Sequence, residues 1–205
     1  MRAIARSGLA FLISGGTGTG KTTLLSAMLG ELPPTDRIVI VEDSRELNPD
    51  HPHCVRLAGR AANAEGIGEV TMTQLVRQAL RMRPDRLVVG EVRGAEISDL
   101  LTALNTGHEG GCGTIHANSI ADLPARLESL AALSGMNREA CHSQIAAALT
   151  AAIQLRRLPN GQRTVEQIGL FRRHKTGEIL VSKAVSCSAD GLIWTAEGEE
   201  LKELL

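Results

Sequence analysis

The sequence predicts an α/β fold in which helices cover both faces of a mainly parallel sheet. Short apolar runs alternate with segments whose apolar residues recur at helical spacing, an order typical of parallel sheets. Hydrophobic residues make up 43% of the chain and charged residues 22%, which is ordinary for a globular protein. With 205 residues, the chain is long enough for one domain with a sizeable core, or for one domain and a small appendage.

The first half of the chain contains three expected strands and two expected helices. Residues 9–14 form a short apolar run that ends in glycines, as expected of a buried strand. Residues 22–29 predict a helix that a glycine and a proline pair then close. Residues 37–41 and the shorter run 55–57 are rich in β-branched or apolar side chains and predict strands. Residues 71–82 carry apolar residues at helical spacing, and a proline shortly afterwards ends this helix.

The next part of the chain continues the alternation. Residues 87–89 predict a strand, and the leucine-rich segment 97–104 predicts a helix that ends near a glycine. Residues 112–116, which follow two glycines, predict a further strand. A leucine stripe over 123–132 predicts a helix, and the alanine-rich run 140–155 predicts one long helix.

After residue 158 the pattern changes to short strands separated by turns, which we expect at 175–177 and at Asp190-Gly191. The predicted division is therefore a core over 1–158 and a β-rich C-terminal subdomain or tail over 159–205. The acidic, leucine-ended segment 197–205 fits either a short docking helix or a frayed terminus.

Several functional classes are disfavoured by composition. The longest apolar runs are far shorter than the roughly 20 residues of a membrane-spanning helix, and no secretion signal opens the chain, so a cytoplasmic location is expected. The four cysteines form no CxxC pair, which argues against a structural zinc module, and the expected cytoplasmic location argues against disulfides. A net charge of −1 and 1% aromatic residues make nucleic-acid binding an unlikely expectation.

A phosphate-binding loop of the pattern GxxxxGK[ST] follows the first expected strand and precedes the first expected helix. Its glycines allow backbone N–H groups to turn toward phosphates, and the helix N-terminus adds the positive end of its dipole. We expect Lys21 to reach the β- and γ-phosphates of ATP and the Thr22 hydroxyl to ligate Mg²⁺. The expected nucleotide-binding residues are Gly16, Thr17, Gly18, Thr19, Gly20, Lys21, Thr22 and Thr23.

Acidic residues follow two of the expected strands. Glu42 and Asp43 close one strand, and Glu91 follows another with a glycine between. Because parallel strands present their carboxyl ends at one sheet edge, where ligands gather, these acids are candidates for chemistry on ATP. A structural role, such as capping a helix or pairing with arginine, is the better interpretation for Asp43 and Glu96. A lone histidine at a strand end, such as His116, is also more often structural than functional.

Taken together, the motifs resemble the type II/type IV secretion-system ATPases, and most of all the branch that powers assembly of Tad (Flp) pili. The segments that carry the resemblance are 13–23 (ISGGTGTGKTT), 41–44 (VEDS), 80–85 (LRMRPD), 89–94 (VGEVRG), 105–108 (NTGH) and 114–119 (TIHANS). The resemblance extends from about residue 2 to about residue 158. It implies a RecA-like P-loop core that forms hexameric rings and converts ATP hydrolysis into movement of an inner-membrane partner.

The resemblance also implies roles for individual residues. Glu42 matches the acidic-box glutamate that polarises the attacking water, and Glu91 matches the atypical Walker B glutamate near Mg²⁺. His116 matches the histidine-box residue that senses the γ-phosphate. Arg60 falls where relatives carry an arginine that acts on nucleotide. Three other arginines compete for that role, namely Arg56, Arg81 and Arg83.

Relatives carry an N-terminal domain before the core, whereas here the phosphate loop begins at residue 15 and residues 1–7 resemble the end of the joining helix. The expectation is therefore weaker ATP binding and impaired ring formation. The complete protein is expected to be a homo-hexamer with no transmembrane segment of its own, bound peripherally to the inner face of the membrane through a pilus or secretion platform protein.

Two other functions stay open. The first is a conjugative or DNA-translocating ATPase, because the same core serves nucleic-acid motors; the basic cluster 172–175 would then matter, although a solvated hairpin turn also explains it. The second is a catalytically silent remnant that only binds nucleotide. The presence of Lys21, Glu42, Glu91 and His116 argues against the silent remnant.

Overall fold

The computed structural model describes residues 1–107, 110–188 and 191–205, and within these ranges the strands form a single nine-stranded sheet. The strands are β1 (Phe11–Ser14), β2 (Ile38–Glu42), β3 (Cys54–Ala58), β4 (Arg86–Val92), β5 (Cys112–Ile115), β6 (Ala151–Arg157), β7 (Arg163–Arg173), β8 (Ile179–Ser188) and β9 (Gly191–Trp194). Their order across the sheet is β3-β2-β4-β5-β1-β6-β7-β8-β9. Every pair from β3 to β6 is parallel, and β7, β8 and β9 extend the sheet by antiparallel pairing.

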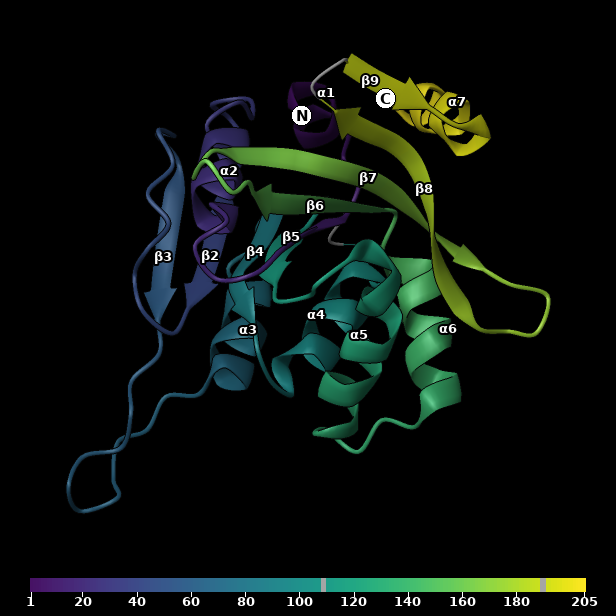
Figure 1. Cartoon of the computed structure of the whole chain (residues 1–205). Coiled ribbons are helices and arrows are strands. Elements are labelled where there is room, and N and C mark those ends of the chain that lie inside the picture. The colour runs from purple at the N-terminus through teal and green to yellow at the C-terminus, as the bar shows by residue number, and fades with distance from the viewer. Residues whose placement is uncertain (108–109, 189–190) are drawn as a thin grey trace.

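Helices cover both faces of this sheet, as predicted (Figure 1). They are α1 (Arg2–Arg6), α2 (Lys21–Leu29), α3 (Met72–Leu80), α4 (Glu96–Leu104), α5 (Leu123–Ala132), α6 (Arg138–Ala148) and α7 (Ala196–Leu204). Buried residues of α3 to α6 belong to one hydrophobic cluster, and those of α1, α2 and α7 belong to another on the opposite face. The mainly parallel α/β fold class is therefore confirmed.

The two clusters explain why the central strands are unbroken apolar runs in the sequence. Along β1, Leu12 packs into the cluster under α3 to α6, whereas Phe11 and Ile13 pack into the cluster under α2. Val39 and Ile40 of β2 divide between the clusters in the same way. Because successive side chains of a strand point to opposite faces, a strand covered on both faces must be apolar at nearly every position.

One expectation was wrong: the alanine-rich run 140–155 is not a single helix. Helix α6 ends at Ala148, Leu149 is already extended, and β6 begins at Ala151. The β6 backbone pairs with β1 on one side and with β7 on the other, and its first five residues are buried. These sheet hydrogen bonds override the helix propensity of alanine, which is a weak preference per residue.

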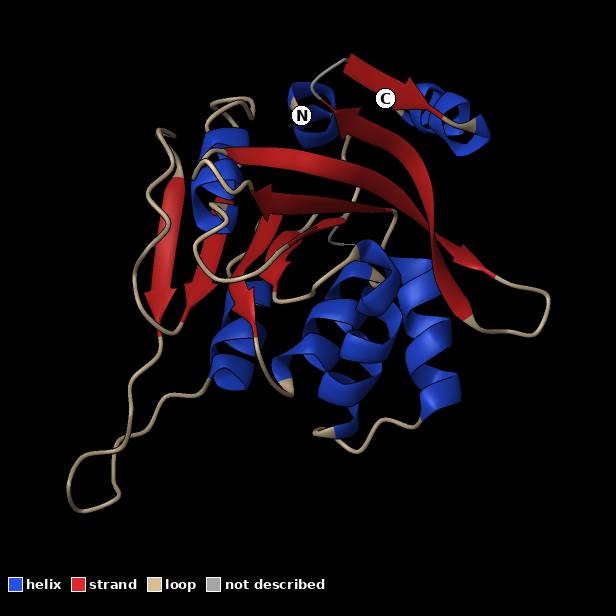
Figure 2. Ribbon diagram, viewed as in Figure 1, coloured by secondary structure: helices blue, strands red, loops and turns tan. Residues whose placement is uncertain are grey.

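The C-terminal strands also differ from the short strands expected there. β7 and β8 have 11 and 10 residues and continue the sheet directly from β6 (Figure 2). The expected turn at Asp190-Gly191 falls partly outside the described residues, because Asp190 is not described. The domain boundary near residue 158 stays a prediction, and the β6–β7 hairpin runs across it.

Among the described residues, no helix combines the length and apolar character that crossing a bilayer requires.

Candidate active site

Four parallel strands bring the predicted site residues to one edge of the sheet. The phosphate loop follows β1, Glu42 ends β2, Glu91 lies near the end of β4, and His116 follows β5. Between these strand ends lies a cleft of about 440 Å³. One wall is the loop and the start of α2, with Thr17, Gly18, Gly20, Lys21, Thr22 and Thr23. The facing wall holds Glu46, Glu91, Arg93, Thr114 and His116, and Arg163 lines the cleft beside the loop itself.

The phosphate loop is held in a conformation that places Lys21 at the base of this cleft. Gly20 precedes α2 with a φ of 91°, a left-handed conformation that glycine adopts at little cost. Lys21 is only 7% exposed, and its Nζ donates to the carbonyl oxygens of Gly15 and Gly16, each at 3.0 Å. Burial lowers the pKa of Lys21, and the nearby Glu91 carboxylate partly opposes this shift. Phosphate oxygens are charged and therefore stronger acceptors than these carbonyls.

Glu91 lies at the centre of the facing wall. Its Oε2 accepts a hydrogen bond from Arg93, and its Oε1 lies 2.7 Å from Nε2 of His116. Burial raises the pKa of Glu91, but the Arg93 hydrogen bond and the charges of Arg93, His116 and Lys21 outweigh it and hold the pKa below its usual value. Burial and Lys21 together lower the pKa of His116. At neutral pH the site therefore contains an ionised Glu91 and a neutral His116.

Oxygen atoms suited to Mg²⁺ lie on both walls. Glu91 Oε1 is buried and forms no hydrogen bond among the described residues, although Nε2 of His116 lies 2.7 Å from it. Across the cleft, Thr22 Oγ1 lies 3.3 Å from Oε2 of Glu46. Mg²⁺ binds hydroxyl and carboxylate oxygens of this kind. The residues present fit Mg²⁺: Thr22 and Glu91 line the cleft, and Glu46 is a further oxygen donor. Their binding of the metal stays a prediction.

Glu42 does not line the cleft. It is 3% exposed, and its Oε1 accepts from the backbone N–H groups of Glu46 at 3.1 Å and Leu47 at 2.8 Å. Its Oε2 is buried without a hydrogen-bond partner among the described residues. Glu42 thus fixes the loop that carries Glu46 into the cleft. Gly90 makes room for this arrangement, because a Cβ on Gly90 would lie 2.6 Å from Cγ of Glu42.

We predict that Gly90→Ala lowers the free energy of unfolding by about 1–3 kcal/mol, a typical cost of overpacking a core. The added methyl group would have to displace the buried Glu42 side chain, which lies 2.6 Å from its position. Thermal or urea unfolding measures the loss. Gly30→Ala is the matched control, because its φ is −66° and its new methyl group meets nothing closer than 3.4 Å.

Removing the Glu42 atom that clashes with the new methyl group should reduce the stability cost of Gly90→Ala. In a double-mutant cycle, Glu42→Ala lacks the Cγ atom that collides with the new methyl group, so the cost of Gly90→Ala should shrink in that background. Equal costs in both backgrounds would contradict the packing assigned to Gly90.

Arg60 lies apart from the phosphate loop. It lines a neighbouring cavity of about 730 Å³, which shares Arg93 with the candidate site. Its Nε donates to the carbonyl oxygen of Gly68 at 2.7 Å, and its backbone pairs with Val70. Among its competitors, Arg56 donates to the Leu47 carbonyl. The action of Arg60 on nucleotide stays a prediction. Of the segment 105–108, His108 lies outside the described residues.

Besides Thr114, sequence reasoning missed three residues of the cleft. Arg93 and Glu46 had a usable signal, because each follows a candidate acid closely and at a strand end. Arg163 had none. It lies 145 positions from Gly18, whose carbonyl oxygen accepts from its Nε at 2.9 Å, and only the pairing of β6 with β7 brings it there.

The lowered pKa of His116 gives a pH-dependent stability. The folded state resists protonation at His116, whereas the unfolded chain takes up the proton near the usual value of 6.5. The contribution of neutral His116 to stability is therefore present above pH 6.5 and is lost as the pH falls below it. We predict that stability falls less as the pH drops below 6.5 in His116→Gln than in the natural chain, measured by urea unfolding. Parallel pH profiles would contradict this.

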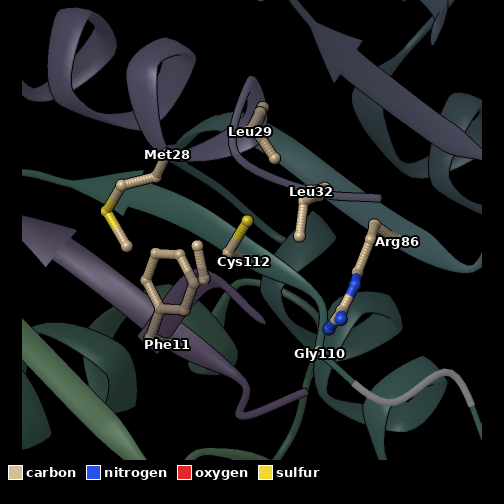
Figure 3. Close-up of a pocket in the computed structure, with 8 residues that line it drawn as sticks. Phe11, Met28, Leu29, Leu32, Arg86, Gly110 and Cys112 are labelled. Atoms are coloured by element: carbon tan, nitrogen blue, oxygen red, sulfur yellow. The ribbon is translucent and has the colours of Figure 1, made fainter. Parts of the chain in front are cut away.

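A much smaller pocket lies at the opposite edge of the sheet, where β1, β4 and β5 begin (Figure 3). Its volume is about 10 Å³, enough for roughly one water molecule and too small for a nucleotide. Figure 3 shows Cys112 pointing between Met28 and Leu32, and the Arg86 side chain reaching toward Gly110. Burial raises the pKa of the Cys112 thiol to about 12, so it is unreactive at neutral pH.

Comparison with known proteins identifies relatives of this chain. The profile of a protein family described as "Type II/IV secretion system protein" matches residues 1–192. A Mycobacterium tuberculosis protein, whose name associates it with conjugal transfer, is 61% identical over 170 residues, which are 83% of this chain and 48% of that protein. The type IV secretion system protein PtlH of Bordetella pertussis is 45% identical over 121 residues, which are 58% of this chain and 35% of PtlH.

A solved structure shows the same fold. The VirB11 ATPase from the Brucella suis type IV secretion system, crystallised with sulphate, aligns with a TM-score of 0.72 and 28% identity. The alignment covers 82% of this chain and 49% of VirB11. The chain thus spans about half the length of the Mycobacterium tuberculosis protein and of VirB11.

Proposed function

The chain belongs to the type II/IV secretion system protein family, and from this premise we propose that it binds MgATP in the cleft beside the phosphate loop and hydrolyses it as the motor part of a secretion or pilus-assembly system. One observation carries the proposal. The phosphate-loop lysine, an ionised glutamate and a neutral histidine, Lys21, Glu91 and His116, face the same cleft at the carboxyl ends of parallel strands. Strand ends of this kind are where α/β proteins bind nucleotides.

In the proposed reaction, water attacks the γ-phosphate of ATP in line with the bond that breaks. Lys21 exchanges its two carbonyl acceptors for phosphate oxygens and neutralises the charge that develops on them. Glu42 orients the water through Oε2, which has no other partner among the described residues, once loop 43–47 moves aside. His116 lies 3.4 Å from Lys21 Nζ, close enough to respond when a γ-phosphate draws the lysine away.

Thr22 and Glu91, with Glu46 beside them, would hold Mg²⁺. When bound, the ion neutralises phosphate charge in the ground state and the transition state. Arg93 keeps Glu91 ionised for this purpose, and it also lies 3.7 Å from Asp43.

The finer assignment follows the Tad pilus-assembly branch that the motifs resemble. In this proposal the complete protein is a homo-hexamer at the inner face of the membrane, where it works on a platform protein of the pilus or secretion system. Arg60 would act on nucleotide across a subunit boundary, because within one subunit it faces the neighbouring cavity instead. The name of PtlH as a type IV secretion system protein supports a role in secretion.

A conjugative motor is the second candidate, and the name of the Mycobacterium tuberculosis relative favours it. A motor that acts on DNA directly would bind duplex DNA with an affinity that falls steeply as salt rises. A motor that acts on a protein partner would not show this salt-dependent affinity for DNA.

Phosphate release from ATP by the purified chain, over a series of protein concentrations, tests the proposed function. Mg²⁺-dependent turnover whose specific rate rises with protein concentration is expected of an assembling motor. Absence of turnover at every concentration, with Mg²⁺ and ATP saturating, would contradict the hydrolysis. Adding duplex DNA at low and high salt separates the two candidates, because only a DNA motor should respond.

A further inference from the structure

Gln154 is a polar side chain within the apolar, buried part of β6. The first five residues of this strand have the sequence AAIQL and are all buried, and Gln154 itself is only 2% exposed. An amide buried in this way is costly unless its oxygen and its nitrogen both find hydrogen-bond partners. The apolar neighbours of Gln154 on β6 have no side-chain groups that could serve as such partners.

The amide of Gln154 instead joins two segments of the candidate active site. Its Oε1 accepts a hydrogen bond of 2.5 Å from Oγ of Ser14, the last residue of β1 before the phosphate loop. Its Nε2 donates to the carbonyl oxygens of Ala117 at 3.4 Å and Asn118 at 3.2 Å. Because carbonyl oxygens can only accept, the nitrogen of the amide has to lie at that end. Gln154 thus connects the start of the phosphate loop to the backbone directly after His116.

His116 lies just beyond the part of the chain that the sheet holds. The pairing of β5 with β1 and with β4 ends at Ile115, and His116 follows it. From there its Nε2 lies 3.4 Å from Nζ of Lys21 and 2.7 Å from Oε1 of Glu91. Both distances depend on where the backbone after Ile115 lies, and the hydrogen bonds of Gln154 hold that backbone.

We propose that Gln154 is a positioning residue, which fixes His116 at contact distance from Lys21 by tying the backbone after His116 to the strand that leads into the phosphate loop. This rests on the proposed function, because it takes the cleft to be the site of ATP hydrolysis. The phosphate loop belongs to the same connection, since Gly15, which follows Ser14, accepts from Nζ of Lys21 at 3.0 Å. A γ-phosphate that draws Lys21 away from Gly15 would therefore act at one end of this connection, with His116 at the other.

An NMR titration of the His116 ring tests this position without requiring hydrolysis. Burial and Lys21 lower the pKa of His116 in the natural chain. Gln154→Met keeps the length of the side chain and removes its hydrogen bonds, so His116 should move out toward solvent and its pKa should rise toward about 6.5.

Two further variants complete the titration. His116→Gln identifies the signal of this ring among those of the other histidines. Gln167→Met is the matched control, because Gln167 is the half-buried residue opposite Gln154 on β7, and it should leave the pKa of His116 unchanged. An unchanged pKa in a folded Gln154→Met chain would overturn the proposal.

The rate of hydrolysis provides an independent test. Gln154→Met should lower kcat by about 10- to 100-fold, the size of loss that a displacement of roughly 1 Å can cause, and should leave the affinity for MgATP unchanged because Lys21 is intact. In a double-mutant cycle, Gln154→Met should cost little in the His116→Gln background, since a residue that acts through His116 has no effect once that ring is absent. Equal losses of kcat in both backgrounds would contradict action through His116.

Ser14→Ala decides the question where Gln154→Met does not fold. It removes only the hydroxyl that donates to the amide oxygen, and it should raise the pKa of His116 by a smaller amount than Gln154→Met. A pKa that this variant also leaves unchanged would overturn the proposal. If the natural chain does not hydrolyse ATP at all, the proposed function fails, and the NMR titration still shows whether Gln154 positions His116.

Discussion

Lys21→Ala is expected to weaken MgATP binding by about a hundredfold, a loss within the range for hydrogen bonds to charged groups when more than one is removed. Lys21 is the buried cation at the base of the cleft, and its hydrogen-bond partners among the described residues are two neutral carbonyl oxygens and His116. Without it, the phosphates would lose the cation at the base of the cleft. Isothermal titration of the purified variant with MgATP measures the loss.

The control for this variant is Lys175→Ala, at an exposed position in the β7–β8 hairpin. It removes the same charge from the chain and should leave MgATP affinity unchanged. Circular dichroism and a thermal unfolding curve verify that the Lys21 variant is folded. A folded Lys21→Ala chain that binds MgATP like the natural chain would contradict the assignment of the phosphate site.

Glu91→Gln is expected to lower the rate of ATP hydrolysis by about 10²–10³-fold, the size of effect seen when one electrostatic group of an active site is removed. The substitution keeps the shape of the side chain and removes its charge. Glu91 is ionised at neutral pH, since the hydrogen bond and charge of Arg93 and the charge of Lys21 help to hold its pKa below the usual value. No hydrogen bond to its Oε1 is formed among the described residues. Single-turnover phosphate release measures the rate.

Measuring ATP binding distinguishes a loss of catalysis from a loss of the folded site. Glu91→Gln should still bind ATP, since the phosphate loop and Lys21 are unchanged. Glu166→Gln is the matched control, because Glu166 is a partly exposed carboxylate that also pairs with an arginine, Arg156, but lies outside the cleft. Full hydrolysis by a folded Glu91→Gln chain would show that this carboxylate does not take part in the reaction.

The fold class could be predicted because the strongest signals were local. Buried parallel strands must be apolar on both faces, and the helices carry apolar stripes with recognisable ends. α3 is an example: Thr71 and Gln74 form a reciprocal capping box at its start. The phosphate loop could be predicted for a similar reason, because the glycines and the lysine that surround the phosphates lie in one continuous segment of the sequence.

The features that escaped prediction depend on contacts between distant segments. Residues 151–155 have a composition that favours a helix, and only their place between β1 and β7 makes them a strand. Arg163 reaches the phosphate loop through that same hairpin.

The placement of Glu42 also depends on a neighbour in space. The sequence identified it as an acid at a strand end, but its burial follows from packing over Gly90 and from two loop N–H groups that its Oε1 accepts. No local pattern contains that information.

A crystal structure of the chain with Mg²⁺ and a non-hydrolysable ATP analogue tests the central claim most directly. We predict phosphates in contact with Lys21 and the backbone of residues 16–22, and a metal ion bound to the Thr22 hydroxyl on the side that faces Glu91. A nucleotide bound elsewhere on the chain, or a cleft without density after crystal growth with saturating analogue, would contradict the account.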